Sequence, residues 1–318
     1  MILLCGIPSE TPLKLTADRL KSLAAPFVIF NQRDFANSEI AFEVANGRIS
    51  GTLRIHEQTH SLESFEAVYS RMMDDRQLPE LADEPPDSPR RTYCRSFHET
   101  LTRWMEIAPA KVINRCAPMA TNSSKPYQTQ LVREAGFLIP ETLITNDPEL
   151  VREFCARYGR VIYKSISATR SIVQTMEEKD FKRLDHIRWC PTQFQAFVPG
   201  TNLRVHVIGE EIFATAIRAD ATDYRYATRQ SGEPAELREA ELSSELAEKC
   251  VQLANALDLV FAGIDLKVTP DDQVYCFEVN PCPAFSFYEI NACQPISAGV
   301  ARCLVASRPN RVGQGFRA

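Results

Sequence analysis

The first third of the chain alternates between continuous apolar runs and segments with helical spacing. "ILLCGI" and "PFVIFN" are short apolar runs typical of buried strands, and "TPLKLTADRLKSL" between them has the periodicity of an amphipathic helix. A second helix is expected near "SLESFEAVYSRMM", then a Pro-rich loop "LPELADEPPDSPRR", a helix "SFHETLTRWMEIA" and a strand "AKVINR". This order predicts an N-terminal α/β domain over residues 1–115.

The order of expected helices and strands changes twice in the rest of the chain. "KPYQTQLVREAGFLIPETLITND", "DPELVREFCARYG" and "RVIYKSI" predict helix, strand, helix and strand, and "PTQFQAFVPG" adds another strand. Two hairpins follow, "NLRVHVIGEEIFATAIR" and "FAGIDLKVTPDDQVYCFEVNP", separated by the helix "LSSELAEKCVQLANALDL"; a helix closes the chain. We therefore expect a small central α+β domain over residues 116–197 and a larger antiparallel α+β domain over residues 198–318.

The second hairpin carries a cluster of side-chain oxygens. Glu278 and Asn280 are two positions apart on one strand and therefore point to the same face. A turn centred between Asp271 and Asp272 places Asp265 directly opposite Glu278. Opposed carboxylates repel unless a cation lies between them, and oxygen ligands suit Mg²⁺ or Mn²⁺. The pattern leaves two interpretations open, a metal site and a solvated hairpin face carrying scattered charge, and other parts of the chain have to decide between them.

The first hairpin carries cations. If its turn lies at Glu210 and Glu211, Arg204 pairs with Arg218 across the two strands. Two like charges side by side call for a counter-ion, and a phosphate or an acyl phosphate would supply it. The alternative is again a solvated pair.

Lys164 ends the strand "RVIYK" and enters the loop "SISATRS", whose hydroxyls include Ser165 and Ser167. Short hydroxyl side chains and free backbone N–H groups bind phosphates well, with a lysine as a point charge on one of them. A surface lysine at a strand end is the alternative. In "TQFQAFVPG", the backbone groups of Ala196 and Val198 are candidates for pairing with adenine.

Composition narrows the class of protein. The chain has 318 residues, 44% of them hydrophobic, which is enough for two or three domain cores. Its net charge of −5 gives no global field for a nucleic acid, and no apolar run approaches the roughly 20 residues of a membrane span. The ten cysteines show no CxxC pair, so we expect reduced, mostly buried thiols in a cytosolic (cytoplasmic) protein. The basic tail "SRPNRVGQGFRA" is interpreted as a solvated terminus.

The motifs together resemble the ATP-grasp ligases. "IYKSI", "QFQAFVPGTNLRV", "AIRADATDYR", "GIDLK" and "FEVNPCP" occur in that family's order over roughly residues 110 to 305. The branch that they resemble most contains the ribosomal-protein glutamate ligases and the microviridin-type (graspetide) peptide ligases. The resemblance implies an ATP-grasp fold preceded by an N-terminal α/β pre-ATP-grasp domain.

The resemblance also implies roles for individual residues. ATP phosphates would contact Lys125 and Lys164 with the hydroxyls of Ser165 and Ser167, and adenine would lie at Gln195, Ala196, Phe197 and Val198. Asn202 would lie near the ribose, and the transferred phosphoryl and acyl groups would face Arg204, Arg218 and Arg225. Two Mg²⁺ ions, with Mn²⁺ as an alternative, would be bound by Asp265, Glu278 and Asn280.

The implied function is an ATP-dependent carboxylate–amine or carboxylate–hydroxyl ligase. It would form an acyl phosphate on a peptide or amino-acid-like substrate, then release ADP and phosphate. Two alternatives stay open, an ATP-grasp kinase of small molecules and a catalytically silent nucleotide-binding module. We expect neither a nucleic acid nor a membrane as partner, and the sequence leaves a homo-oligomer open. The first 110 residues are expected to help select the substrate, although they contain no recognisable motif.

Overall fold

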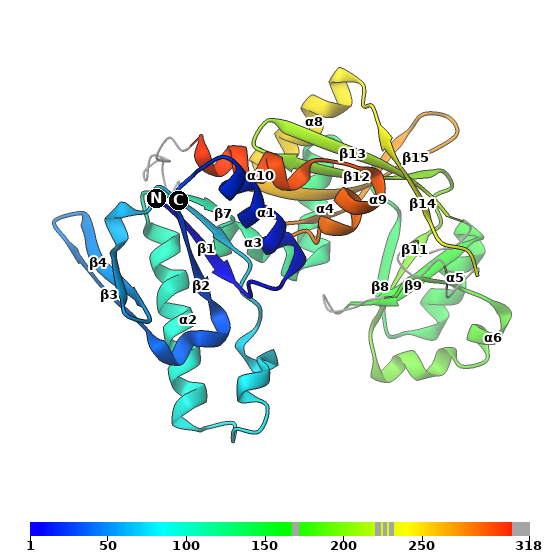
Figure 1. The fold of residues 1–318 in the computed structure, drawn as a ribbon. Coiled ribbons are helices and arrows are strands. Elements are labelled where there is room, and N and C mark those ends of the chain that lie inside the picture. Colours follow the sequence, from blue (N-terminus) through cyan, green and yellow to red (C-terminus); the bar gives the residue numbers. More distant parts are fainter. Residues whose placement is uncertain (167–171, 220–223, 225–227, 229–231, 307–318) are drawn as a thin grey trace.

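The computed structural model describes residues 1–166, 172–219, 224, 228 and 232–306. Four sheets organise this part of the chain, and Figure 1 shows them in three groups. Two sheets belong to the N-terminal part, one to the middle and one to the C-terminal part. All ten cysteines are free thiols, as expected from their spacing, but only four of them are buried, so the expectation of mostly buried thiols is wrong. None of the helices in the described residues is long and apolar enough to cross a membrane.

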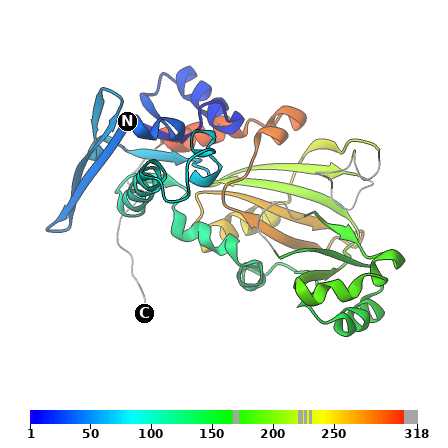
Figure 2. The ribbon, with the colours of Figure 1, turned by 90° about the horizontal axis from the view of Figure 1, so that it is seen from below.

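The N-terminal unit is built on a parallel sheet of order β2-β1-β6-β7. Its core gathers Phe30, Phe97, Leu101 and Trp104, which are almost fully buried. The elements are β1 (Ile2–Gly6), α1 (Thr11–Ser22), β2 (Phe27–Asn31), β6 (Ala67–Ser70), α2 (Pro89–Ile107) and β7 (Lys111–Ile113). A second, antiparallel sheet of β3 (Ser38–Ala45), β4 (Arg48–Ile55) and β5 (Gln58–Ser61) projects from this unit (Figure 2).

The prediction of a helix near residues 61–73 is wrong. Residues 67–70 form strand β6, an interior strand between β1 and β7. Ala67, Val68 and Tyr69 are all buried, so side chains on both faces of this strand are covered. A short apolar run buried on both faces is typical of a parallel sheet, and helical spacing of the flanking residues does not outweigh that burial.

The central unit has an antiparallel sheet of order β10-β9-β11-β8. Val151, Val161, Leu184 and Phe194 form its buried core. The elements are β8 (Thr142–Thr145), α5 (Pro148–Tyr158), β9 (Val161–Ser165), β10 (Gln174–Thr175), α6 (Glu178–Phe181) and β11 (Thr192–Ala196).

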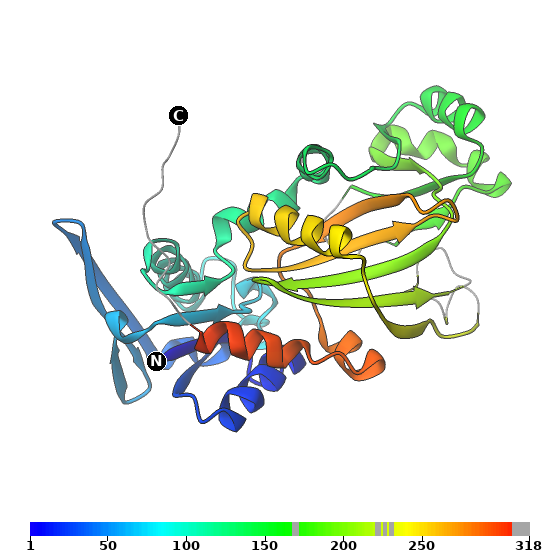
Figure 3. The ribbon, with the colours of Figure 1, turned by 90° about the horizontal axis from the view of Figure 1, so that it is seen from above.

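The C-terminal unit has a five-stranded antiparallel sheet of order β14-β13-β12-β15-β16. Val205, Ile264 and their neighbours on one face pack against Leu253 of the long helix α8, which Figure 3 shows lying along the sheet. The elements are β12 (Thr201–Ile208), β13 (Glu211–Arg218), β14 (Glu236–Ala240), α8 (Ser244–Ala256), β15 (Phe261–Val268), β16 (Val274–Asn280) and α9 (Ser286–Ala292).

Two further helices join the units. Helix α4 (Lys125–Glu134) packs against β16, and α10 (Ile296–Val305) packs against α1 of the N-terminal unit (Figure 3). Between β7 and α4 lies the short helix α3 (Cys116–Met119). Short 3-10 segments are η1 (Gln32–Asn37), η2 (Leu62–Ser64), η3 (Asp75–Gln77), η4 (Pro79–Leu81), η5 (Ala120–Ser123) and η6 (Leu184–Trp189). Because the connections cross between units, the boundaries expected at residues 115 and 197 stay a prediction.

Candidate active site

A row of charged side chains crosses three strands of the C-terminal sheet on one face. Arg204 of β12 lies opposite Asp265 of β15, and Asp265 lies opposite Glu278 of β16. Arg204 Nη1 donates to Asp265 Oδ1 at 2.6 Å. The predicted pairing of the two carboxylates is therefore confirmed.

A β-bulge produces that pairing. Nearer the hairpin turn, Leu266 pairs with Cys276, so Phe277 is an extra residue on β16. The simple turn expected between Asp271 and Asp272 gives a register that is one residue out at the tip of the hairpin. The inserted residue restores the opposition of Asp265 and Glu278 further along.

Cations compensate both carboxylates. Lys125, at the start of α4, donates to Glu278 Oε1, and its Nζ is also 2.6 Å from Asn122 Oδ1. Burial would raise the pKa of Glu278, but the nearby positive charges of Lys125, Lys164 and Arg204 outweigh burial and hold that pKa below its usual value. Glu278 is therefore ionised at neutral pH.

Two local features fix the cations in place. Gln128 of α4 donates from Nε2 to the Val279 carbonyl at 2.8 Å and accepts from the Val279 N–H at 3.0 Å, which attaches α4 to the metal strand. The guanidinium of Arg204, which is only 5% exposed, lies across Gly263. A Cβ at Gly263 would lie 2.2 Å from Arg204 Nη2, so a larger residue would displace the arginine.

The oxygen atoms on this face fit a hard cation. Asn280 lies two residues beyond Glu278, opposite Gly263, and its Oδ1 accepts from the Cys282 N–H at 2.9 Å. Among the contacts described for these residues, Oδ2 of Asp265 and Oε2 of Glu278 accept no bond. Among the described residues, no three His, Cys, Asp or Glu side chains are grouped so that they could hold a metal ion. The candidate donors on this face are therefore two carboxylates and one amide. Mg²⁺ accepts such a set when water and phosphate oxygens complete its shell.

The predicted pairing of Arg204 with Arg218 is wrong. The β12–β13 turn consists of Gly209 and Glu210, so Arg204 lies opposite Thr215 and Arg218 lies opposite Glu236 of β14. Gly209 has φ +59, which permits the tight two-residue turn. Glu211, the first residue after this turn, is therefore already paired with Ile208. Arg218 is three residues beyond Thr215, so alternation directs it to the other face of the sheet, at the exposed end of β13.

A buried aromatic and polar cluster supports Arg204 from behind. Arg204 Nε donates to His206 Nε2 at 3.4 Å, and the His206 ring lies 4.9 Å from the Tyr288 ring in a T-shaped contact. Tyr288 OH is 2.8 Å from Tyr224 OH. Burial and the charge of Arg204 hold the pKa of His206 well below 6.5, so the imidazole is neutral and able to accept. These residues gave no signal in the sequence beyond the strand and helix on which they lie.

Lys164 of β9 is half-buried, pairs in register with Gln193 of β11, and contributes its charge to the lowered pKa of Glu278. The central sheet therefore brings a second lysine toward the carboxylates. Ser165 follows it at the exposed end of β9. Ser167 and Arg225 lie outside the described residues.

The candidate adenine segment, residues 195–198, is extended, but not all of its backbone groups are free. The Ala196 N–H donates to the Glu141 carbonyl at 2.9 Å, so this N–H is not available to a base as expected. Phe197 N–H likewise donates to the Arg160 carbonyl at 2.9 Å. The buried Gln195 side chain donates from Nε2 to Thr142 Oγ1 at 3.0 Å and has a structural role in this conformation.

Lys267 is a residue that sequence reasoning missed. Its Nζ donates to the Val198 carbonyl at 3.0 Å and lies 5.2 Å from the centre of the Phe197 ring, which the Arg160 guanidinium also contacts at 3.6 Å. Lys267 pairs in register with Asn202 of β12, which shares a face with Arg204. Alternation along "GIDLK" from Asp265 would have placed Lys267 on the same face.

A groove lies between α4 and the central sheet. Lys125, Gln130 and Leu138 line one side of it, and Glu141, Thr142 and Gln193 line the other. Oε1 of Gln193 is buried without a hydrogen-bond partner in the described contacts. The groove thus extends from the lysine that holds Glu278 to the segment before β8.

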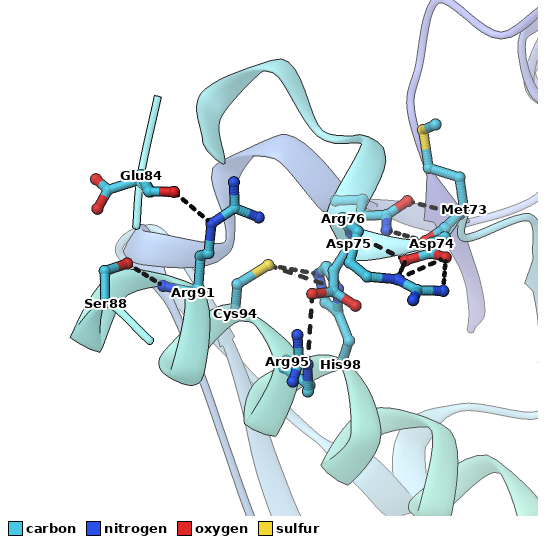
Figure 4. Close-up of polar contacts among 11 residues, drawn as sticks. Met73, Asp74, Asp75, Arg76, Glu84, Ser88, Arg91, Cys94, Arg95 and His98 are labelled. Atoms are coloured by element: carbon cyan, nitrogen blue, oxygen red, sulfur yellow. Dashed lines mark hydrogen bonds and ion pairs between the residues drawn. The ribbon is translucent and has the colours of Figure 1, made fainter. Parts of the chain in front are cut away.

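A second depression is lined by Asp75 and Arg76 and by Arg95 and His98 of α2. Figure 4 shows Asp75 beside Cys94, Arg95 and His98. Cys94 Sγ is 3.7 Å from His98 Nδ1, and a cysteine nucleophile and its histidine base would have a similar spacing. Burial raises the pKa of Cys94 to about 12 and lowers the pKa of His98. Both groups are therefore neutral, and this pair is a packing contact rather than an activated thiolate.

The comparisons with known proteins agree with this geometry. Residues 122–303 match the family model described as a RimK-like ATP-grasp domain, which is more than half of the chain. The chain belongs to the RimK-like ATP-grasp family. None of the curated proteins matches this RimK-like chain.

Solved structures of other ATP-grasp proteins resemble this family member over nearly its whole length. The ATP-grasp ligase PsnB, complexed with a phosphomimetic variant of a minimal precursor, Mg and ADP, is 26% identical, with 96% of this chain and 98% of that chain covered at a TM-score of 0.77. The macrocyclase MdnC of Microcystis aeruginosa MRC, bound with the precursor peptide MdnA, is 23% identical over 96% and 100% of the chains at a TM-score of 0.80. A RiPP-associated ATP-grasp ligase of Chryseobacterium gregarium is 20% identical over 98% and 99% at 0.80.

The last two neighbours are too distant in sequence to show more than the fold. The family match and the PsnB structures confirm the predicted ATP-grasp fold and the predicted ATP-dependent ligase, and the PsnB structures contain Mg and ADP. The roles of individual residues stay predictions.

Proposed function

We propose that this RimK-like ATP-grasp ligase activates a carboxylate of a peptide as an acyl phosphate and joins it to an amine or a hydroxyl. The observation that carries the proposal is a row of charges on one sheet face, in which Lys125 and Arg204 flank the opposed carboxylates of Glu278 and Asp265. Such a row leaves carboxylate oxygens for a metal and cations for phosphate at the same place, as phosphoryl transfer requires. A silent binding module has no use for two opposed carboxylates.

The proposed nucleotide site begins at Lys125, which lines one side of the groove beside α4. Lys125 and Lys164 would contact the phosphates, and the hydroxyls of Ser165 and Ser167 would assist them. Adenine would lie against the segment from Gln195 to Val198, with the Val198 N–H replacing the occupied N–H of Ala196 as the donor. Asn202 would lie near the ribose, directly opposite Lys267 on the neighbouring strand.

Asp265, Glu278 and Asn280 are the residues that would hold Mg²⁺, because their oxygens share one face and the carboxylates each have an oxygen to spare. Bound there, the ions would neutralise negative charge on the phosphates during transfer. Arg204 keeps Asp265 in place through the 2.6 Å bond and contributes positive charge to the same face.

The reaction has two steps. A carboxylate oxygen of the substrate attacks the γ-phosphorus of ATP, the bond to the bridging oxygen breaks, and ADP leaves. The amine or hydroxyl then attacks the acyl carbon, phosphate leaves, and the proton of the acceptor passes to phosphate or solvent. Arg225 is the cation that we propose to meet the acyl phosphate together with Arg204. Arg218, expected in the same role, lies at the exposed end of β13 on the other face of the sheet, so it has no part in this proposal.

A peptide is the proposed substrate because the similar structures include ATP-grasp ligases complexed with a precursor and with leader and core peptides. Their coverage extends through the N-terminal unit, so this unit is shared with peptide ligases rather than added to a nucleotide-binding core. We propose that residues 1–110 help to choose the peptide.

The test is to incubate the protein with Mg²⁺, ATP and a peptide encoded beside its gene that contains acidic and hydroxyl or amine side chains. The expected products are ADP, phosphate and a peptide that has lost one water for each bond formed, in equal amounts. A peptide that gains and keeps a phosphoryl group would make the protein a kinase. No nucleotide turnover with any such peptide would favour a silent module.

A further inference from the structure

The segment that follows the metal strand, Pro281 to Pro283, is held by two residues of the N-terminal unit. Arg71, just beyond β6, donates from Nη1 to the Pro283 carbonyl at 3.2 Å and contacts Cys282 Sγ at 3.4 Å. Its side chain is only 6% exposed. An arginine from one unit is therefore buried against the backbone of the other.

Glu10 fixes the orientation of Arg71. The two Glu10 oxygens accept from Arg71 Nε at 2.9 and 2.8 Å, and Oε1 also accepts from Nη2 at 2.6 Å. Although burial lowers the pKa of Arg71, the neighbouring Tyr69, Cys282 and Glu10 outweigh burial and keep the guanidinium charged. The bidentate contact leaves Nη1 directed at the segment.

Asn114, after β7, holds the start of the same segment. Its Nδ2 donates to the carbonyls of Pro281 and Phe261, at 2.6 Å each. Its Oδ1 accepts from the N–H groups of Val260 and Phe261, at 2.8 and 3.0 Å. Asn114 is 5% exposed, so one side chain ties the start of β15 to the end of β16 and has no water to compete with it.

The held segment is in direct contact with the metal-binding face. The Cys282 N–H donates to Asn280 Oδ1 at 2.9 Å, so the position of Cys282 sets the rotation of the Asn280 amide. Pro283 lies against Gly263, under the guanidinium of Arg204: a Cβ on that glycine would be 2.8 Å from Pro283 Cβ. A shift of the segment would thus move one proposed metal ligand and the support of a catalytic cation together.

We propose that Arg71 and Asn114 are positioning residues through which the N-terminal unit sets the geometry of the metal-binding face. This inference deepens the proposed function, since it rests on Asp265, Glu278 and Asn280 being the metal ligands. The N-terminal unit is then a structural part of the active site and not only a surface for choosing a substrate.

The experiment compares the variants Arg71→Lys and Glu10→Gln with the control Arg33→Lys. Arg33 belongs to the same unit and forms an ion pair with Glu80, but on the surface and away from the segment. Glu10→Gln changes a partly exposed side chain and is therefore expected to fold, even if Arg71→Lys does not. Binding of Mn²⁺ in the presence of ADP is followed by electron paramagnetic resonance, and amide exchange of Cys282 by mass spectrometry.

We expect Arg71→Lys and Glu10→Gln to weaken Mn²⁺ binding about tenfold, the usual effect of losing an outer-shell partner. Cys282 amide exchange should accelerate in both variants, and Arg33→Lys should match the wild type in both measurements. Unchanged Mn²⁺ binding in a folded variant would overturn the inference while the metal site stands. A wild-type protein that binds no Mn²⁺ would overturn the proposed metal site, and the inference with it.

Discussion

The C-terminal sheet face and the N-terminal unit contribute to the site in different ways. On the sheet face, Arg204, Asp265 and Glu278 lie at matching positions of three neighbouring strands and present charged atoms directly to a ligand. In the N-terminal unit, Asn114 contacts backbone atoms and Arg71 contacts the Pro283 carbonyl and Cys282 Sγ, and both act through the segment after β16. The groups that contact a ligand therefore lie on one regular sheet face, whereas the geometry of that face depends on irregular contacts from a distant part of the chain.

The largest expected effect tests the sheet face itself. Glu278→Gln, and separately Asp265→Asn, should lower ligation about a thousandfold or more, since each removes a formal charge that orients metal and phosphate. Glu10→Gln in the N-terminal unit should cost only about tenfold, because it acts through Arg71. Rates of phosphate release measure all three.

Glu236→Gln is the matched control for these variants. Glu236 lies on β14 of the same sheet, where it pairs with Arg238 in an exposed ion pair, and its variant should keep full activity. Circular dichroism and thermal unfolding should show that each variant is folded. Near-wild-type rates for both Glu278→Gln and Asp265→Asn would remove the metal assignment.

The two arginines of the first hairpin sharpen the comparison within the sheet. Arg218→Ala should leave ligation, the KM for ATP and the melting temperature almost unchanged, because Arg218 is exposed and lies on the other face of the sheet from the carboxylates. Arg204→Lys should lower both turnover and melting temperature, because Arg204 is buried against Asp265. Equal losses of stability in the two variants would mean that the positions of these side chains have been misinterpreted.

Lys164 tests what the central unit contributes to ATP binding. Lys164→Ala should raise the KM for ATP at least about tenfold, as expected for the loss of one charge-assisted contact worth about 1.5–3 kcal/mol. Lys179→Ala is the control, because Lys179 is an exposed lysine of α6 that pairs with Glu177 in the same unit. If the two variants have the same KM for ATP, Lys164 is an ordinary surface lysine.

The smallest effect concerns a buried histidine in each unit. Burial lowers the pKa of His98, and burial together with Arg204 lowers that of His206 well below 6.5. Below about pH 6.5 the unfolded chain binds protons at these histidines that the folded chain does not bind. The free energy of unfolding is therefore highest above about pH 6.5 and falls as the pH decreases, by up to about 1.4 kcal/mol per pH unit for each histidine.

The measurement is the pH dependence of the urea midpoint between pH 7 and 5 for His206→Gln and His98→Gln. Removing His206 should flatten this dependence more than removing His98, because the pKa of His206 is lowered further. An identical slope in the wild type and His206→Gln would show that His206 takes up a proton in the folded state.

Much of the fold and part of the site were predictable from the sequence. The turn expected between Asp271 and Asp272 predicted the opposition of Asp265 and Glu278 because the bulge at Phe277, which gave no signal in the sequence, offsets a register that is one residue out at the tip. The same method failed for Arg204 and Arg218, where the φ of Gly209 moved the turn. The helix expected near residues 61–73 failed because tertiary burial between β1 and β7 overrode helical spacing.

Contacts between units left no periodic signal. Arg71 and Asn114 are single polar residues after β6 and β7, and only the folded chain brings them to Pro281–Pro283. The same holds for Gln128, whose bonds to Val279 attach α4 to the metal strand. Sequence patterns therefore predicted the residues on the regular sheet and missed the residues that hold this sheet from outside.

The identity of the nucleotide product tests the central claim most directly. With the peptide substrate, Mg²⁺ and ATP, chromatography should show ADP and no AMP, and a coupled assay should show phosphate released in step with the modified peptide. This outcome follows from an acyl phosphate formed beside Arg204, Asp265 and Glu278. AMP and pyrophosphate as the main products would contradict the account, because they would require attack at the α-phosphorus and an adenylate intermediate.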